Sequence, residues 1–181
     1  MEYRLYFFVP YNISDIQKGI QAGHAALEYA REYGHTQEYV QFIENDKTWV
    51  ILNGGTTRDF NDSVYGYGSL DNIWIEMNQY AIANSTFREV DLNYALTAIC
   101  FLADERVWNK EKYPDFEEED KWDRWCEYLG GEKNAVLRNI IKDKHLARKS
   151  HFMWLYRIHS ILKWLFVILV IFIIIQFIKI F

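Results

Sequence analysis

The C-terminal end of the chain carries an apolar stretch long enough to cross a lipid bilayer. Residues 164–178 read WLFVILVIFIIIQFI and contain no charged side chain. Extended to Ile161–Phe181, the stretch would be about 31 Å long as a helix, which matches a hydrocarbon core of about 30 Å. It is apolar on every face, so a buried core helix is the less favoured interpretation. We predict one C-terminal transmembrane helix.

Basic side chains are concentrated before this stretch, and only Lys179 lies at its far end. The positive-inside rule therefore predicts a single-pass, tail-anchored protein whose globular part is cytoplasmic. The expected partners are the lipid bilayer and, for a tethered domain, a membrane protein. The basic residues before the stretch are Lys142, Lys144, Arg148, Lys149, Arg157 and Lys163.

Charge and composition divide the chain into three segments. Residues 1–108 carry 7 Lys+Arg against 15 Asp+Glu, a net charge of −8. Residues 109–150 carry 10 of each sign and many aromatic side chains, and residues 151–181 carry 3 basic residues and no acid. We expect an α/β domain at 1–108, a charged aromatic-rich helical connector at 109–150, and a juxtamembrane segment with the anchor at 151–181. The acidic first segment argues against nonspecific attraction to nucleic-acid phosphates.

The two cysteines, Cys100 and Cys126, do not have a metal-ligand spacing and do not form a disulfide framework. Cys100 lies in an apolar run and is expected to be a thiol of the core. The sequence therefore predicts neither a metal nor a cofactor.

The order of the predicted elements gives the fold class. Ser14 and Gln17 form a capping-box pattern, so a helix is expected to follow Ser14 and to continue to about Tyr33. The order β-α-α-β-α-β-β predicts a mixed four-stranded sheet with helices packed on it. Strands are expected at Arg4–Pro10, Thr48–Asn53, Phe87–Val90 and Leu96–Ala103, further helices at Gln37–Asn45, Leu70–Ala83 and Lys133–Ala147, and a loop at Gly54–Ser69.

The first helix carries three polar residues, Gln17, Gln21 and His24, at positions i, i+4 and i+7. This spacing puts them on one side of the helix, where they need partners or a ligand. His24 alone is more often a hydrogen-bonded structural residue. Asp91 and Asn93 lie in the turn between the last two strands, where they are either functional groups or turn formers.

The segment QKGIQAGHAALEYA, which follows the strand RLYFFVP, resembles the first-helix signature of type 2 peptidyl-tRNA hydrolases. The later segment FREVDLNYALTAICFLA resembles the paired C-terminal strands of the same family, and its short turn is similar to that of small phage-type members. The resemblance covers residues 3–108. It implies hydrolysis of the ester between a peptide and tRNA without a metal, with peptidyl-tRNA as the partner. It also implies catalytic roles for Gln21, His24, Asp91 and Thr97. Asn93, in the same turn as Asp91, is a further candidate substrate-binding residue.

The family signature has a lysine four residues before the glutamine, where this chain has Gln17. Its neighbour Lys18 is rotated about 100° from Gln17 around a helix, so we expect it to reach the site only by snorkelling or by local unwinding. Gln17 and Lys18 are therefore candidate substrate-binding positions. Two functions stay open: a membrane-anchored peptidyl-tRNA hydrolase, or a catalytically degenerate member that serves as a membrane-tethered binding module.

Overall fold

A computed structural model describes residues 1–57, 68–115, 121–147 and 163. Apart from Lys163, these residues belong to one unit, Met1–Ala147. The predicted anchor Ile161–Phe181, with the exception of Lys163, lies outside the described residues. Within the described part, no helix combines the length and the apolar character that a membrane crossing requires.

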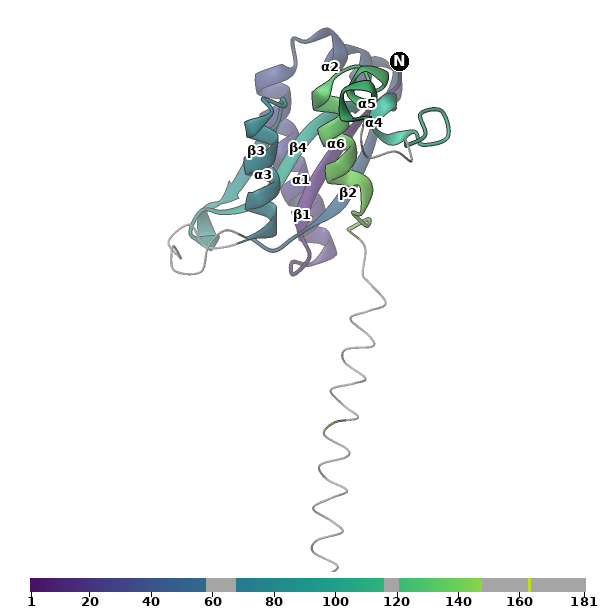
Figure 1. Ribbon diagram of the computed structural model, residues 1–181. Coiled ribbons are helices and arrows are strands. Elements are labelled where there is room, and N and C mark those ends of the chain that lie inside the picture. Colours follow the sequence, from purple (N-terminus) through teal and green to yellow (C-terminus); the bar gives the residue numbers. More distant parts are fainter. Residues whose placement is uncertain (58–67, 116–120, 148–162, 164–181) are drawn as a thin grey trace, which may run out of the picture. The chain divides into compact units, whose positions relative to one another are not determined.

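Four strands form one mixed sheet in the order β2-β1-β4-β3, which confirms the predicted α/β fold class (Figure 1). β1 pairs with β2 in parallel and with β4 in antiparallel orientation, and β3 pairs with β4 in antiparallel orientation. The strands are β1 (Tyr3–Pro10), β2 (Thr48–Gly55), β3 (Ser85–Glu89) and β4 (Ala95–Asp104). β1 and β4 are the central strands, and this explains why their sequences are apolar almost throughout.

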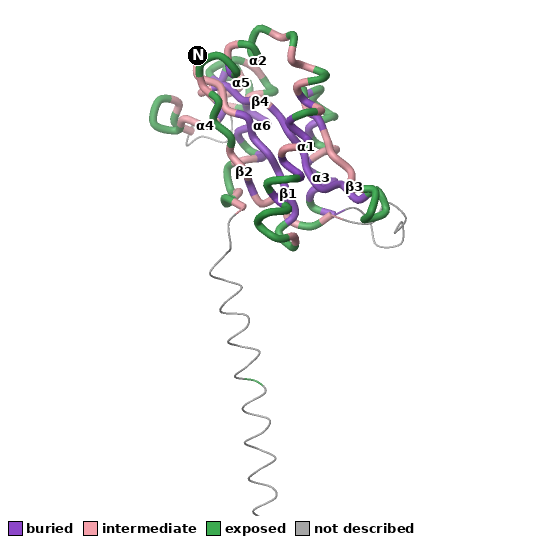
Figure 2. Tube along the Cα trace, turned by 180° about the vertical axis from the view of Figure 1, so that it is seen from behind, coloured by how far each residue is buried: buried purple, intermediate pink, exposed green. Residues whose placement is uncertain are grey.

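Helices cover both faces of the sheet, so the side chains of β1 alternate between two cores. Leu5, Phe7 and Val9 pack with α1 (Asp15–Tyr33), whereas Tyr6 and Phe8 pack with α3 (Ser69–Gln79) and α6 (Glu132–Lys142). Figure 2 shows the strands buried between these layers. The remaining helices are α2 (Gln37–Gln41), a π-helical turn (Phe42–Asp46), a 3₁₀ turn (Val90–Leu92), α4 (Glu105–Trp108) and α5 (Trp122–Tyr128).

The predicted capping box starts α1. The Ser14 side chain accepts from the backbone N–H of Gln17 at 3.2 Å, and the Gln17 Oε1 accepts from the backbone N–H of Ser14 at 3.1 Å. The helix turns Lys18, Ala22, Ala25 and Tyr29 toward the sheet, with Gln21 at the margin of this buried face. This places α1 along β3 and β4, next to the candidate site.

Residues from the expected connector 109–150 contribute to the core. Val136, Leu137 and Ile140 of α6 belong to the same cluster as Tyr6 and Phe8 of β1. The fully buried Arg138 holds the preceding segment, because its Nε donates to Asp115 at 2.9 Å and its Nη1 donates to the carbonyl of Val107 at 3.0 Å. α6 is therefore part of the layer that covers one face of the sheet.

The two edges of the sheet differ. Residues 145–147 follow α6 and lie beside the outer edge of β2, where the N–H of Asn53 donates to His145 and the N–H of Ala147 donates to Ile51, both at 2.9 Å. In the described part of the chain, no strand pairs with the outer edge of β3. The backbone hydrogen-bonding groups on that edge are not used by the sheet.

Candidate functional site

Two linked hydrogen bonds, one buried and one partly buried, join α1 to the two C-terminal strands. The Thr97 hydroxyl donates to Oε1 of Gln21 at 2.7 Å, and the Nε2 of Gln21 donates to Oε2 of Glu89 at 2.9 Å. Thr97 is 1% exposed and Gln21 is 8% exposed, whereas Glu89 is half-buried. The structure thus brings together two predicted site residues, Gln21 and Thr97, and adds a carboxylate that sequence reasoning missed.

A β-bulge directs Thr97 toward this site. The pairing of β3 with β4 shifts between Phe87↔Ala98 and Arg88↔Leu96, so Thr97 is the extra residue of β4. Regular alternation would turn Thr97 away from Ala98, but both face α1, because Ala98 packs in the α1 core and Thr97 contacts Gln21. Bulges commonly re-aim side chains in this way next to functional sites.

His24 lies against the outer part of the same strand pair. Its ring is stacked on Phe87, with 4.3 Å between ring centroids and 15° between planes, and the residue is exposed. The carbonyl of Phe87 also accepts a hydrogen bond from Thr97 at 3.3 Å. Phe87 therefore lies between His24 and the Gln21–Thr97 pair, and His24 is on the solvent side of Phe87.

Gln17 and Lys18 lie on different sides of α1. Gln17 is exposed, and its Oε1 is engaged with Ser14 at the start of α1. Lys18 is 6% exposed on the sheet-facing side, and its Nζ lies 3.0 Å from Oδ1 of Asp15. Lys18 thus lies on the buried side of α1 and Gln17 on its exposed side, and the route by which Lys18 would reach the site stays a prediction.

Asp91 and Asn93 lie at the exposed tip between β3 and β4. Asp91 belongs to the 3₁₀ turn, and Asn93 follows in the left-handed conformation with φ 52°. The carboxylate that meets Gln21 is that of Glu89, two residues before Asp91. The alternation of side chains along a strand is a signal that could have identified Glu89, since it shares a face with Phe87.

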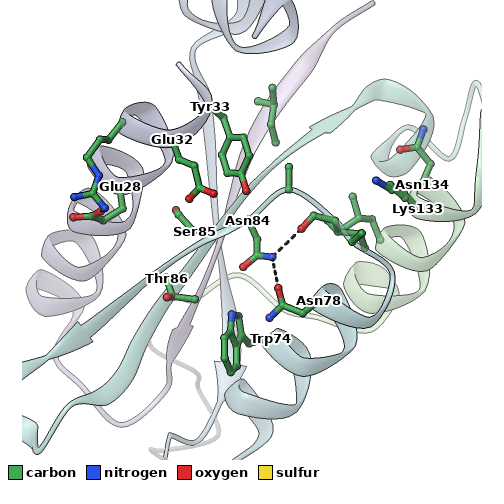
Figure 3. A pocket seen from close by; sticks show the side chains of 16 residues that line it. Glu28, Glu32, Tyr33, Trp74, Asn78, Asn84, Ser85, Thr86, Lys133 and Asn134 are labelled. Carbon is green, nitrogen blue, oxygen red and sulfur yellow. Dashed lines mark hydrogen bonds and ion pairs between the residues drawn. The ribbon is translucent and has the colours of Figure 1, made fainter. Parts of the chain in front are cut away.

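A hollow of about 730 Å³ opens at the other end of β3 (Figure 3). It is lined by the end of α1, the end of α3, the start of β3 and α6, and none of the seven predicted site residues lines it. Its polar lining residues include Glu28, Glu32, Asn78, Asn84 and Lys133. Burial raises the pKa of Tyr33 in this hollow, and its hydrogen bond to Glu32 acts in the same direction.

The chemistry available at the Gln21 site is that of a carboxylate with amide and hydroxyl groups. Among the described residues, no group of three or more His, Cys, Asp or Glu could hold a metal ion. Cys100 is buried, and desolvation raises the pKa of its thiol well above the ordinary value, which makes it a poor nucleophile. Comparison of the chain with protein-family models and with curated proteins finds no match.

Proposed function

We propose that this protein is a membrane-anchored hydrolase of the peptidyl-tRNA hydrolase type, which cleaves the ester between a peptide and tRNA. The observation that supports this proposal is the hydrogen-bonded chain Thr97–Gln21–Glu89. It combines a carboxylate with two hydrogen-bond donors at the junction of α1 and the hairpin of β3 and β4, where the sequence resemblance places the family's glutamine and threonine.

Ester hydrolysis requires a base for the attacking water and donors for the oxyanion. We assign Glu89 as the base, because it is half-buried and held by Gln21, whereas Asp91 is exposed. Glu89 takes a proton as the water oxygen attacks the ester carbonyl. The second N–H of the Gln21 amide is the donor for the oxyanion, and the Thr97 hydroxyl positions Gln21 by donating to its Oε1. Glu89 returns the proton to the departing ribose oxygen.

The anchor belongs to the same proposal. A transmembrane helix at Ile161–Phe181 would keep the domain at a cytoplasmic membrane surface and raise its concentration near membrane-bound targets. Carbonate extraction of membranes tests this part. The full chain should stay in the membrane pellet, and truncation after residue 160 should release it; release of the full chain would contradict the anchor.

A second candidate is a membrane-tethered binding module that has lost catalysis. Two observations favour it. Both polar groups of Gln21 are already paired and Thr97 is almost fully buried, which is also the arrangement of a structural hydrogen-bond network. In addition, the net charge of −8 over residues 1–108 disfavours tRNA phosphates.

Release of the N-acetylamino acid from an N-acetylaminoacyl-tRNA by the full chain in detergent micelles decides between the two candidates. The hydrolase reading expects turnover, a loss of at least about a hundredfold in kcat/KM for Glu89→Gln, and a change below about threefold for Asp91→Asn. Equal losses in both variants would overturn the assignment of Glu89. Failure of the wild-type chain to hydrolyse the ester would favour the binding module.

A further inference from the structure

The outer edge of β3 is suited to hold another strand. Among the described elements it is the sheet edge without a neighbour, because residues 145–147 lie beside the opposite edge on β2. The extra residue of the neighbouring bulge belongs to β4, so Ser85–Glu89 itself keeps the side-chain alternation of a strand. An open strand edge presents a row of N–H and C=O groups that an extended peptide matches.

Aromatic side chains flank this edge on both faces of the sheet. On the α1 side, His24 stacks on Phe87 with 4.3 Å between ring centroids. On the α3 side, the Arg88 guanidinium lies 5.4 Å from the ring of Trp74. Successive side chains of an added strand would point to opposite faces of the sheet. Successive side chains would therefore contact His24 on the α1 side and Trp74 on the α3 side in turn.

The hollow of Figure 3 lies where β3 begins, and its lining includes Trp74, Ser85 and Thr86. Within it, the Nδ2 of Asn84 donates to Oδ1 of Asn78 at 3.2 Å and to the carbonyl of Ile82 at 2.8 Å. These two hydrogen bonds do not use the Nδ2 of Asn78 or the Oδ1 of Asn84. A donor and an acceptor side by side are the complement of a peptide unit or of a primary amide.

The charges of the hollow select against a strongly charged occupant. Glu28 and Arg31 form an ion pair at 2.5 Å, and Glu32 and Lys133 bring one charge of each sign. The formal charge of these four lining residues is zero, so a phosphorylated or polybasic segment would gain little here. An uncharged polar peptide fits the amide groups of Asn78 and Asn84 and the ring of Trp74.

We propose that the outer edge of β3 binds an extended, uncharged peptide segment by strand addition, with one end of the peptide in the hollow beside Asn78 and Asn84. Five residues, Ser85–Glu89, form the edge. At about 3.3 Å per residue they offer about 16 Å to the peptide. The far end of this strand edge is Glu89, which contacts Gln21. If the proposed hydrolase function holds, the edge receives the peptide part of the substrate, but binding itself does not require hydrolysis.

Fluorescence anisotropy of a labelled, blocked seven-residue peptide of threonine and valine around a central tyrosine, titrated with the full chain in micelles, tests the proposal. N-methylation of two adjacent central amides blocks strand pairing in either register, and should weaken binding at least tenfold. The matched control peptide carries the two extra methyl groups on its side chains, and should change affinity by less than about threefold. Equal losses for both peptides, or no binding of the parent peptide, would overturn strand addition.

Two protein variants locate the binding to this edge. His24→Ala removes the ring that flanks β3 on the α1 side, and should weaken peptide binding about fivefold. Leu27→Ala changes an exposed position on the outer side of the same helix, and should leave peptide binding unchanged. Equal effects of the two variants would contradict the assigned edge. Sedimentation of the same sample tests a rival occupant: a dimer that fails to bind the peptide would place a second copy of β3 on the edge and overturn the proposal. These measurements of binding are separate from the hydrolysis assay.

Discussion

The two edge strands of the sheet, β2 and β3, differ in whether another described segment of the chain is hydrogen-bonded beside them. At β2, the chain returns after α6 and supplies two backbone hydrogen bonds, between Asn53 and His145 and between Ala147 and Ile51. At β3, the described chain adds no strand, and the Gln21–Glu89 contact and His24 lie beside the edge instead. Natural sheets usually protect their edges against pairing with other chains. Among the described residues, a segment lies beside the β2 edge and none pairs with the β3 edge, which is the arrangement that the proposed peptide binding at β3 requires.

The covered edge depends on α6, so the largest expected effect comes from removing the residue that fixes this helix. Arg138→Ala leaves Asp115 and several backbone carbonyls without their buried donor, and should lower the free energy of unfolding by about 3 kcal/mol. Denaturation of the full chain in micelles measures this change. Hydrogen exchange at the amide of Asn53 should also become faster.

The neighbouring exposed residue Asn139 provides the control for that experiment. Asn139→Ala should change the free energy of unfolding by less than about 0.5 kcal/mol. If Arg138→Ala unfolded like the control and kept the protection of Asn53, the cover of β2 would not depend on α6.

Next to the β3 edge, the largest loss of folding stability is expected from a change of Thr97, the extra residue of the bulge. Thr97→Val keeps the shape of the side chain but leaves the buried Oε1 of Gln21 without its donor, which should cost about 1–3 kcal/mol of folding stability. Thr86→Val makes the same chemical change on half-buried β3 and should cost less than about 0.5 kcal/mol. Comparable losses measured by denaturation would show that the Thr97–Gln21 contact does not stabilise the fold.

A smaller change opens the covered edge locally. Ala147→Pro removes the N–H that donates to Ile51, and should cost about 1 kcal/mol while leaving the sheet intact. Ala147→Ser keeps the N–H and serves as the control. Hydrogen exchange at Asn53 should accelerate only in the proline variant. Unchanged exchange in that variant would mean that residues 145–147 do not protect β2.

The smallest expected effect depends on pH. Burial by itself raises the pKa of Asp115, but hydrogen bonds from Arg138 and Lys110 outweigh it and hold the pKa below the ordinary value. A carboxyl whose pKa is lower in the folded state stabilises the fold above its unfolded pKa of about 3.9, and loses this contribution as the pH falls through the folded value. Asp115→Asn should therefore lose less stability than the wild type between pH 5 and about pH 2. Parallel acid titrations of both proteins, followed by denaturation midpoint, would contradict this.

The arrangement of strands and helices could be predicted because its signals are local. The apolar run of β1 and the capping box at Ser14 and Gln17 specify a strand and a helix start from neighbouring residues alone. Which side of α1 is buried could not be predicted from neighbouring residues alone. The apolar residues Ile16 and Leu27 are 78% and 70% exposed on α1, while Lys18 is buried. The position of the sheet, not residue polarity, decides which side of the helix is covered.

The candidate site was predictable only in part for a related reason. Gln21 and Thr97 were recognised by the resemblance, but no local pattern relates Thr97 to Glu89 across a bulged strand pair. The cover of β2 by residues 145–147 is a pairing between segments about ninety residues apart, and it carries no sequence motif. Long-range pairing of this kind is set by the whole fold.

The bulge at Thr97 also bears on how such a site can arise during evolution. The last residue pair between β1 and β4 is Phe8↔Ile99, so the bulge lies just beyond that ladder and affects only the pairing with β3. A single-codon insertion there would turn a hydroxyl from one face of the sheet to the other without moving the central strands. A single-codon deletion would undo it. The polar contact between α1 and the hairpin thus depends on the length of the gene at one position, and an ancestor could have gained it in one step.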